Sequence, residues 1–170
     1  MEFQSLIEER FSCRSFKDLP VEADKIQAIV NAGQIAPTAN NRQPFHIWVF
    51  SSEDSLEKVR ACTPCHFGAP VILALGCQED AGWVRSFDNM TYASVDASIV
   101  GTHMLLEAQN QGLGSTWVAF FDPAKLRAQF PDQDFGTLVA LFPIGYPADD
   151  AKPSDNHYQR KALSELVTEL

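Results

Sequence analysis

The sequence lacks several features that would indicate a membrane, secreted or nucleic-acid-binding protein. Its longest apolar stretch, from Pro70 to Cys77, is far shorter than the roughly 20 residues that span a bilayer. Residues 1–4 carry neither the basic nor the apolar region of a signal peptide, so we expect a cytoplasmic protein. Positive charge is scarce: 13 Lys and Arg stand against 22 Asp and Glu, for a net charge of −9. This balance argues against binding to nucleic acid or to an anionic membrane.

Familiar catalytic motifs are missing as well. No G-x-G-x-x-G follows a predicted strand, which argues against a dinucleotide-binding Rossmann unit. No H-E-x-x-H zinc motif occurs, and Ser115 lacks the G-x-S-x-G context of a nucleophile elbow. The sequence therefore offers no nucleophile and base of its own, and this absence is compatible with a bound cofactor that performs the chemistry.

The chain is suited to a single domain. It has 170 residues, 45% hydrophobic and 21% charged, which is enough for a real hydrophobic core. No repeat, low-complexity tract or linker divides it, so residues 1–170 are expected to form one unit. Predicted helices and strands are mixed without strict alternation. We therefore predict an α+β sandwich with a four- to five-stranded sheet and helices on both faces.

Hydrophobic periodicity and capping residues predict the individual elements. The predicted helices cover about residues 2–10, 22–35, 52–61, 92–111 and 122–130. The predicted strands cover residues 46–50, 70–77, 115–120 and 137–144. Residues 148–159 are polar and predict a surface arm, after which residues 161–168 recover some apolar spacing. Such a tail needs a surface on which to rest.

The predicted helix 92–111 has an unusual surface. Two adjacent rows of small residues run along it, Ala93, Ala97 and Gly101 in one and Ser94, Ser98 and Thr102 in the other. Small side chains let another backbone approach closely, and apolar residues cover most of the remaining surface. The pattern predicts either a central helix within one subunit or a helix that packs against its copy across a two-fold axis.

An N-terminal stretch, Arg10-Phe11-Ser12-Cys13-Arg14, places two arginines four residues apart with a serine between them. Guanidinium groups bind phosphate through two parallel hydrogen bonds, and a serine hydroxyl can add a third. R-x-S-x-R is therefore a candidate phosphate site. The alternative is a pair of surface arginines held by salt bridges.

A second stretch, residues 36–45, concentrates amide and hydroxyl side chains in a loop between a helix and a strand. Its candidate ligand-binding residues are Pro37, Thr38, Asn41 and Gln43. Amides both donate and accept hydrogen bonds, which suits the edge of a heteroaromatic ring such as a flavin. The alternative is ordinary turn chemistry, because Pro, Asn and Thr are common in turns.

Together, and in this order, the two stretches resemble the FMN-dependent nitroreductase family, which carries R-x-S-x-R followed by A-P-S/T-x-x-N-x-Q-P. The resemblance continues through Gly112–Ser115 and Gly145–Pro147 and ends at Arg160–Leu163, which looks like the family's terminal R-K-P-L. It spans nearly the whole chain and implies an α/β/α sandwich with a mostly antiparallel sheet.

The resemblance also implies roles for individual residues. It assigns Arg10, Ser12, Arg14, Arg160 and Lys161 to the FMN phosphate or its surroundings. It assigns Pro37, Thr38, Asn41, Gln43, Gly114 and Ser115 to the flavin ring and ribityl chain. No metal ligand and no catalytic side chain are implied, because flavin N5 carries the hydride.

The activity implied by the resemblance is oxidoreduction in a ping-pong cycle. NADH or NADPH would reduce FMN, and a nitroaromatic, quinone or activated alkene would then be reduced. The family's dimer implies a homodimer through the helix 92–111, pockets lined by both chains, and a C-terminal arm, about residues 146–170, that reaches the partner. A non-enzymatic FMN carrier or sensor remains a second possibility.

Trp83 and Phe87 lie four residues apart in the irregular segment 78–90 and could share one face of a short helix. One interpretation is a satellite hydrophobic cluster. The other, which the resemblance supports, is an aromatic wall of the substrate pocket.

Cys62-Thr63-Pro64-Cys65-His66 is a competing motif, because C-x-x-C-H is the attachment signature of c-type haem. Other interpretations are a zinc site that uses Cys62, Cys65 and either His66 or His103, a thiol–disulfide switch at Cys62 and Cys65, or reduced cysteines in a turn. Cys13 lies between two arginines, whose charge favours a reactive thiolate, although it may equally be a small spacer.

Overall fold

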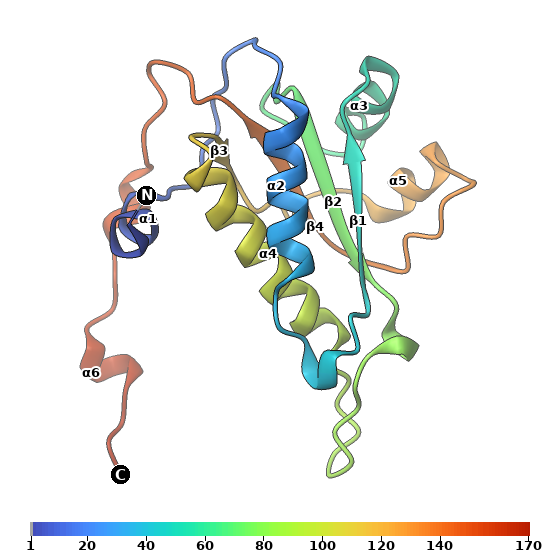
Figure 1. Ribbon diagram of the computed structural model, residues 1–170, viewed down its shortest axis with the longest axis vertical. Coiled ribbons are helices and arrows are strands. Elements are labelled where there is room, and N and C mark those ends of the chain that lie inside the picture. The colour runs from blue at the N-terminus through green and yellow to red at the C-terminus, as the bar shows by residue number, and fades with distance from the viewer. Residues whose placement is uncertain (1) are drawn as a thin grey trace.

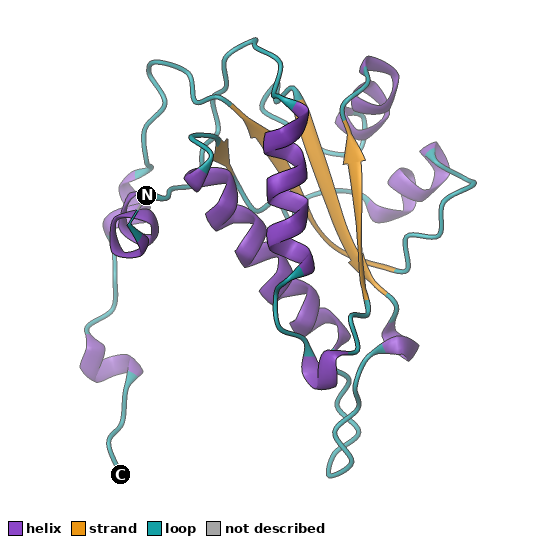
Figure 2. Cartoon of the chain, viewed as in Figure 1, coloured by secondary structure: helices purple, strands orange, loops and turns teal. Residues whose placement is uncertain are grey.

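The computed structural model describes residues 2–170, which form a four-stranded antiparallel sheet between two helical layers (Figure 1). The strands are β1 (Phe45–Phe50), β2 (Val71–Cys77), β3 (Gly114–Ser115) and β4 (Thr137–Gly145), in the order β1-β2-β4-β3. The helices are α1 (Phe3–Glu9), α2 (Ala23–Gln34), α3 (Glu53–Arg60), α4 (Ala93–Asn110), α5 (Pro123–Gln129) and α6 (Leu163–Leu166). Figure 2 shows α2 and α4 on one face of the sheet and α3 and α5 on the other, which confirms the predicted sandwich.

Strand β2 shows why both faces are covered. All seven of its residues are buried, as its continuous apolar sequence predicts. Successive side chains point to opposite faces, so Leu73 and Leu75 pack in the core under α2 and α4, whereas Ile72 and Ala74 pack under α3 and α5.

Local capping signals are also confirmed. The Ser52 side chain accepts a hydrogen bond from the Ser55 N–H at the start of α3, and Asp122 does the same for Lys125 before Pro123 opens α5. These short-range signals need no tertiary information.

The predicted strand 115–120 is wrong in its length. Strand β3 contains only Gly114 and Ser115, and Val118 forms a single isolated bridge with Leu141. The chain leaves the sheet because other partners hold it: Thr63 Oγ1 donates to the Phe120 carbonyl at 2.6 Å, and the Asp122 N–H donates to the Cys62 carbonyl at 2.9 Å. Hydrogen bonds to the turn after α3 therefore take the place of the strand pairing that was predicted for this segment.

The short helix considered for Trp83 and Phe87 is also wrong. Residues 83–92 form a hairpin in which the Tyr92 N–H donates to the Trp83 carbonyl at 2.9 Å, and Val84 is bridged to Thr91. Trp83 packs edge-on against Tyr92, with ring centroids 5.3 Å apart, whereas Phe87 is 94% exposed at the tip. The two aromatic residues therefore do not share a face.

Helix α4 is central, and its two rows of small residues have different neighbours. The row Ala93, Ala97 and Gly101 is buried toward the chain's own sheet, where a Cβ on Gly101 would lie 2.6 Å from Trp117 Cζ3 and 2.9 Å from Phe142 Cζ. In the other row, Ser94 and Thr102 are exposed. The first row is therefore explained within one subunit, and the second row leaves a side of α4 open.

Replacing Gly101 with alanine is expected to destabilise the protein. The added methyl would force Trp117 and Phe142 apart, at a cost of about 1–3 kcal/mol that exceeds the gain in helix propensity of about 1 kcal/mol. Denaturant unfolding of Gly101→Ala at fixed protein concentration would measure the difference, with circular dichroism as a check that the helices persist. An unfolding midpoint equal to or above that of the wild type would contradict the packing described for α4.

Beyond β4 the chain leaves the body of the molecule. Figure 1 shows the C-terminal arm passing α1 and ending in α6 and an extended tail. Every residue from 161 to 170 is exposed, including Leu163, Leu166 and Val167. Within residues 2–170, no helix is both long and apolar enough to cross a membrane.

Candidate functional site

The structure brings three of the sequence motifs together at one end of the sheet. Ser12 is bridged in parallel to Ser115, and the Cys13 N–H donates to the Ser115 carbonyl at 3.0 Å. The same segment then meets the Gly145–Pro147 motif, because the Lys17 N–H donates to the Tyr146 carbonyl at 2.8 Å. Gly114 is required for this approach, since a Cβ there would lie 2.7 Å from Cys13.

Arg14 is exposed beside this junction, and its guanidinium donates only a long hydrogen bond, 3.3 Å, to the Ser12 carbonyl. Within residues 2–170, neither Arg10 nor Arg14 forms an ion pair with a carboxylate. The salt-bridge interpretation of these arginines is therefore wrong. Two guanidinium groups without an acidic partner near a serine are suited to an anionic ligand.

A small cavity of about 140 Å³ opens next to Arg14. Its other lining residues come from the turn after α3 and from the loop after β3: Cys65, Phe67, Thr116, Trp117, Val118, Ala119 and Phe120. The sequence interpretation missed the loop residues because it assigned them to a strand. It considered Cys65 for haem attachment, zinc binding or a thiol–disulfide switch, or as a reduced cysteine in a turn, and not as a residue of this cavity.

The amide-rich loop lies elsewhere and has a strained backbone. Asn40, Asn41 and Gln43 have φ values of 54°, 52° and 51°, the left-handed region that non-glycine residues rarely adopt. The Thr38 hydroxyl accepts a hydrogen bond from the Gln43 N–H at 3.1 Å and stabilises this bend. The side chains of Asn41 and Gln43 are exposed, as is Pro37, so the loop presents them outward.

The two halves of the predicted cofactor site stand at opposite ends of α4. The Ala39 N–H donates to Asp96 in the first turn of α4, whereas Gly114 follows the last turn (Figure 1). From Asp96 to Asn110 the helix rises about 21 Å at 1.5 Å per residue. The structure therefore does not bring Thr38, Asn41 and Gln43 of one chain to Arg14 of the same chain.

Arg160 and Lys161 lie on the exposed C-terminal arm. Arg160 lines a hollow with Ile7 and Glu8 of α1 and donates hydrogen bonds to the carbonyls of His157 and Gln159. Within residues 2–170, no contact joins these two residues to the junction at Ser12 and Ser115. Their assignment to phosphate remains a prediction.

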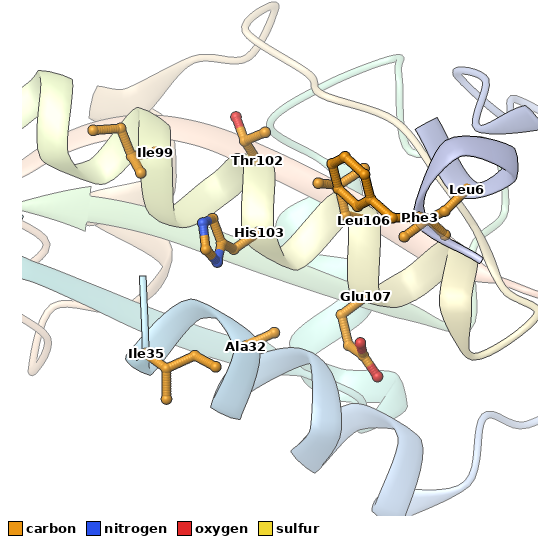
Figure 3. Close-up of a pocket in the computed structure, with 9 residues that line it drawn as sticks. All are labelled: Phe3, Leu6, Ala32, Ile35, Ile99, Thr102, His103, Leu106 and Glu107. Carbon is orange, nitrogen blue, oxygen red and sulfur yellow. The ribbon is translucent and has the colours of Figure 1, made fainter. Parts of the chain in front are cut away.

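An apolar groove of about 530 Å³ runs along the open side of α4 (Figure 3). It is lined by Phe3 and Leu6 of α1, Ala32 of α2 and Ile35 just after it, and Ile99, Thr102, His103, Leu106 and Glu107 of α4. Ile35 is 78% exposed and Phe3 66% exposed, which is unusual for side chains of this size.

The cysteine motif does not assemble a metal site. Within residues 2–170, no three His, Cys, Asp or Glu side chains are placed to hold a metal ion. His66 Nδ1 accepts a hydrogen bond from the Gly68 N–H, and burial, followed by the charge of Arg60, lowers the pKa of His66. His103 lies on the groove of α4, on the other face of the sheet from Cys62. The zinc set considered from the sequence is therefore wrong.

Burial shields two of the thiols, Cys13 and Cys62. Burial raises the pKa of Cys62, whose Sγ donates to the Lys58 carbonyl at 3.2 Å. Burial also raises the pKa of Cys13, and this outweighs the lowering caused by Ser15 and Arg14. Cys13 is fully buried against Gly114, which makes it the small spacer and not the reactive thiolate.

The fold and the site define a class: an α+β sandwich with Arg14, which has no carboxylate partner among the described residues, near the sheet edge, and an amide-rich loop at the far end of a central helix. The profile of the nitroreductase family matches residues 7–63 and 64–146, so the chain belongs to the nitroreductase family. A curated relative from Thermus thermophilus, named NADH dehydrogenase, is 30% identical over 86% of this chain and 87% of its own length.

Solved structures agree with this family. A nitroreductase family protein from Clostridium difficile has a TM-score of 0.90 and 32% identity, covering 99% of this chain and 98% of its own. A protein from Exiguobacterium sibiricum, described as a nitroreductase in complex with FMN, has a TM-score of 0.84 at 15% identity. It covers 100% of this chain and 98% of its own, and at this identity the likeness shows the fold alone.

Proposed function

We propose that the chain is an FMN-dependent oxidoreductase that oxidises NADH or NADPH and reduces a small acceptor, such as a nitroaromatic, a quinone or an activated alkene. The observation that carries the proposal is Arg14, whose guanidinium has no carboxylate partner among residues 2–170 and which lines a cavity close to the Ser12–Ser115 bridge. The names of the Thermus relative and of the FMN-bound structure support the donor and the cofactor, respectively.

The residues present fit FMN. Arg10 and Arg14 would hold the phosphate, with Ser12 as a further donor, because charge-assisted hydrogen bonds to phosphate are strong. Thr38, Asn41 and Gln43 would orient the polar edge of the ring. When bound, FMN would supply the hydride-transfer chemistry between the nicotinamide and the acceptor, while these residues bind and orient it.

A homodimer would complete the site. Because the two halves stand at opposite ends of α4, a second copy packed in the reverse direction would set its amide-rich loop beside Arg14 of the first. A two-fold axis then gives two identical pockets, each lined by both chains. The apolar groove between α1, α2 and α4 is the surface that such a partner would cover.

The hydroxyl row of α4 is suited to this burial. Ser98 Oγ donates to the Ser94 carbonyl at 2.8 Å, and Thr102 Oγ1 donates to the Ser98 carbonyl at 2.9 Å. Each donor is already satisfied within the helix, so contact with a partner would leave no orphaned O–H group. The small side chains would also allow two helices to approach closely.

Two exposed segments fit the same dimer. The apolar residues of the tail, Leu163, Leu166 and Val167, are exposed in a single chain and would rest on the partner. Phe87, at the hairpin tip near the amide-rich end of α4, would border the partner's substrate pocket. Trp83 packs edge-on against Tyr92 and would stabilise the hairpin.

The test is the absorption spectrum of the purified protein after FMN is added and the excess removed, followed by an NAD(P)H oxidation assay with menadione as acceptor. Flavin bands that stay with the protein and turnover that depends on them are expected. Retained flavin without turnover would point to a carrier or sensor. A colourless protein that will not hold FMN would overturn the proposal.

A further inference from the structure

The side chain of Asp96 is a carboxylate buried in the core beside the amide-rich loop. Of the acidic residues between 2 and 170 it alone is buried, at 1% exposure, and it lies in the first turn of α4. Its Oδ1 accepts a hydrogen bond from the Ala39 N–H at 2.9 Å, and its Oδ2 has no hydrogen-bond partner among the described residues. The buried neighbours on its helix, Ala93, Ala97 and Val100, are apolar.

Packing alone does not account for an acid at this position. Burying a carboxylate is costly unless hydrogen bonds satisfy both oxygens, and here only one is engaged. A small apolar side chain would avoid that cost. What Asp96 provides is a single, well-placed acceptor for the loop that crosses the start of α4.

The loop needs that acceptor because its backbone is strained. Three of the four residues from Asn40 to Gln43 have positive φ, and such conformations persist only where the surroundings hold them. Asp96 holds the loop at Ala39, and the Gln78 N–H holds its far end through the Pro44 carbonyl at 2.8 Å. Anchored through its backbone, the loop keeps the side chains of Asn41 and Gln43 exposed.

We propose that Asp96 is a positioning residue for the flavin ring, which it serves by fixing the backbone of residues 38–43 so that Thr38, Asn41 and Gln43 are pre-arranged for binding. This inference rests on the proposed function. Asp96 itself touches neither the phosphate half of the site nor any reacting atom. Its contribution is that the loop does not have to be ordered when flavin binds, because ordering would otherwise reduce affinity.

The experiment compares full-length wild type with Asp96→Ala, which removes the acceptor, and Asp96→Asn, which keeps an Oδ1 acceptor. Asp122→Ala is the matched control, because the Asp122 carboxylate also accepts a backbone N–H, that of Lys125 at 2.9 Å, but at the start of α5 and away from the loop. Two readouts are taken: hydrogen exchange of the Ala39 amide without flavin, and titration with FMN and with riboflavin, which lacks the phosphate.

We expect the Ala39 amide to be protected in the wild type, Asp96→Asn and Asp122→Ala, and to exchange rapidly in Asp96→Ala. We expect Asp96→Ala to bind FMN and riboflavin each about tenfold more weakly, with Asp96→Asn within about threefold of the wild type. The absorption bands of FMN bound to Asp96→Ala should also shift toward those of free FMN.

Either of two results would overturn the inference: wild-type flavin affinity in Asp96→Ala, or an equally large loss in Asp96→Asn. A global loss of structure would appear as faster exchange throughout the sheet, which separates it from a local effect on the loop. Failure of the wild type to bind FMN would instead overturn the proposed function. The exchange readout at Ala39 would still decide whether Asp96 holds the loop.

Discussion

Arg14→Ala is expected to weaken FMN binding about tenfold to a hundredfold while leaving riboflavin binding nearly unchanged. The range follows from about 1.5–3 kcal/mol for a hydrogen bond to a charged group. Arg14 has no carboxylate partner among the described residues, so its removal breaks no ion pair and should leave the fold intact. Fluorescence titration with each flavin would measure both affinities.

Lys58→Ala is the matched control for this prediction. It removes the same charge from α3, where Lys58 forms an exposed pair with Asp54 that contributes little to stability. Arg10→Ala should behave like Arg14→Ala. Equal losses of FMN and riboflavin affinity in Arg14→Ala would show that the guanidinium does not bind the phosphate. Unchanged affinity for both flavins would show that Arg14 is not part of the site.

Thr102→Glu is expected to separate the proposed dimer and to release FMN with it. Thr102 is exposed in a single chain and lines the apolar groove, so a carboxylate there would be buried without a partner in the dimer. An uncompensated buried charge costs about 3–5 kcal/mol, enough to raise the dimer dissociation constant by about two orders of magnitude or more. Sedimentation over a range of concentrations would measure it.

The loss of FMN is the informative part of this result. Thr102 is not among the proposed FMN ligands, so weaker FMN binding by Thr102→Glu would come from separation of the two half-sites. Ser51→Glu, at an exposed position between β1 and α3, is the control and should leave both properties unchanged. A dimer that survives Thr102→Glu, or a wild-type monomer that holds FMN, would refute the shared site.

Much of the fold could be predicted because its signals are local. Helices α2 and α4 begin and end within one residue of the predicted bounds, since periodicity and flanking residues define them. The strand predicted at 115–120 failed because Thr63 and Asp122 hold that loop through long-range hydrogen bonds. The helix considered for Trp83 and Phe87 failed because cross-strand hydrogen bonds close a hairpin there.

The site residues also divide into those that local sequence signals predict and those that depend on long-range contacts. The motifs at Arg10–Arg14 and Pro37–Gln43 could be found from residue types alone, because guanidinium and amide groups have characteristic ligands. Asp96 has only a weak signal in the sequence: it is the sole acidic residue in the stretch 93–106, which is otherwise small or apolar except for His103. Its bond to Ala39 joins residues 57 positions apart and has no local signature.

The sequence by itself determined the class of fold, the anion-binding and amide-rich motifs, and the resemblance that the family match then bore out. Only the tertiary structure decided where those motifs stand. Ser12 reaches Ser115 through a bridge between distant segments, and α4 keeps the amide-rich loop a helix length away. The physical reason is that residue types specify chemistry, whereas a rigid helix packed on a sheet fixes distance, and here α4 holds the amide-rich loop away from Arg14 of the same chain.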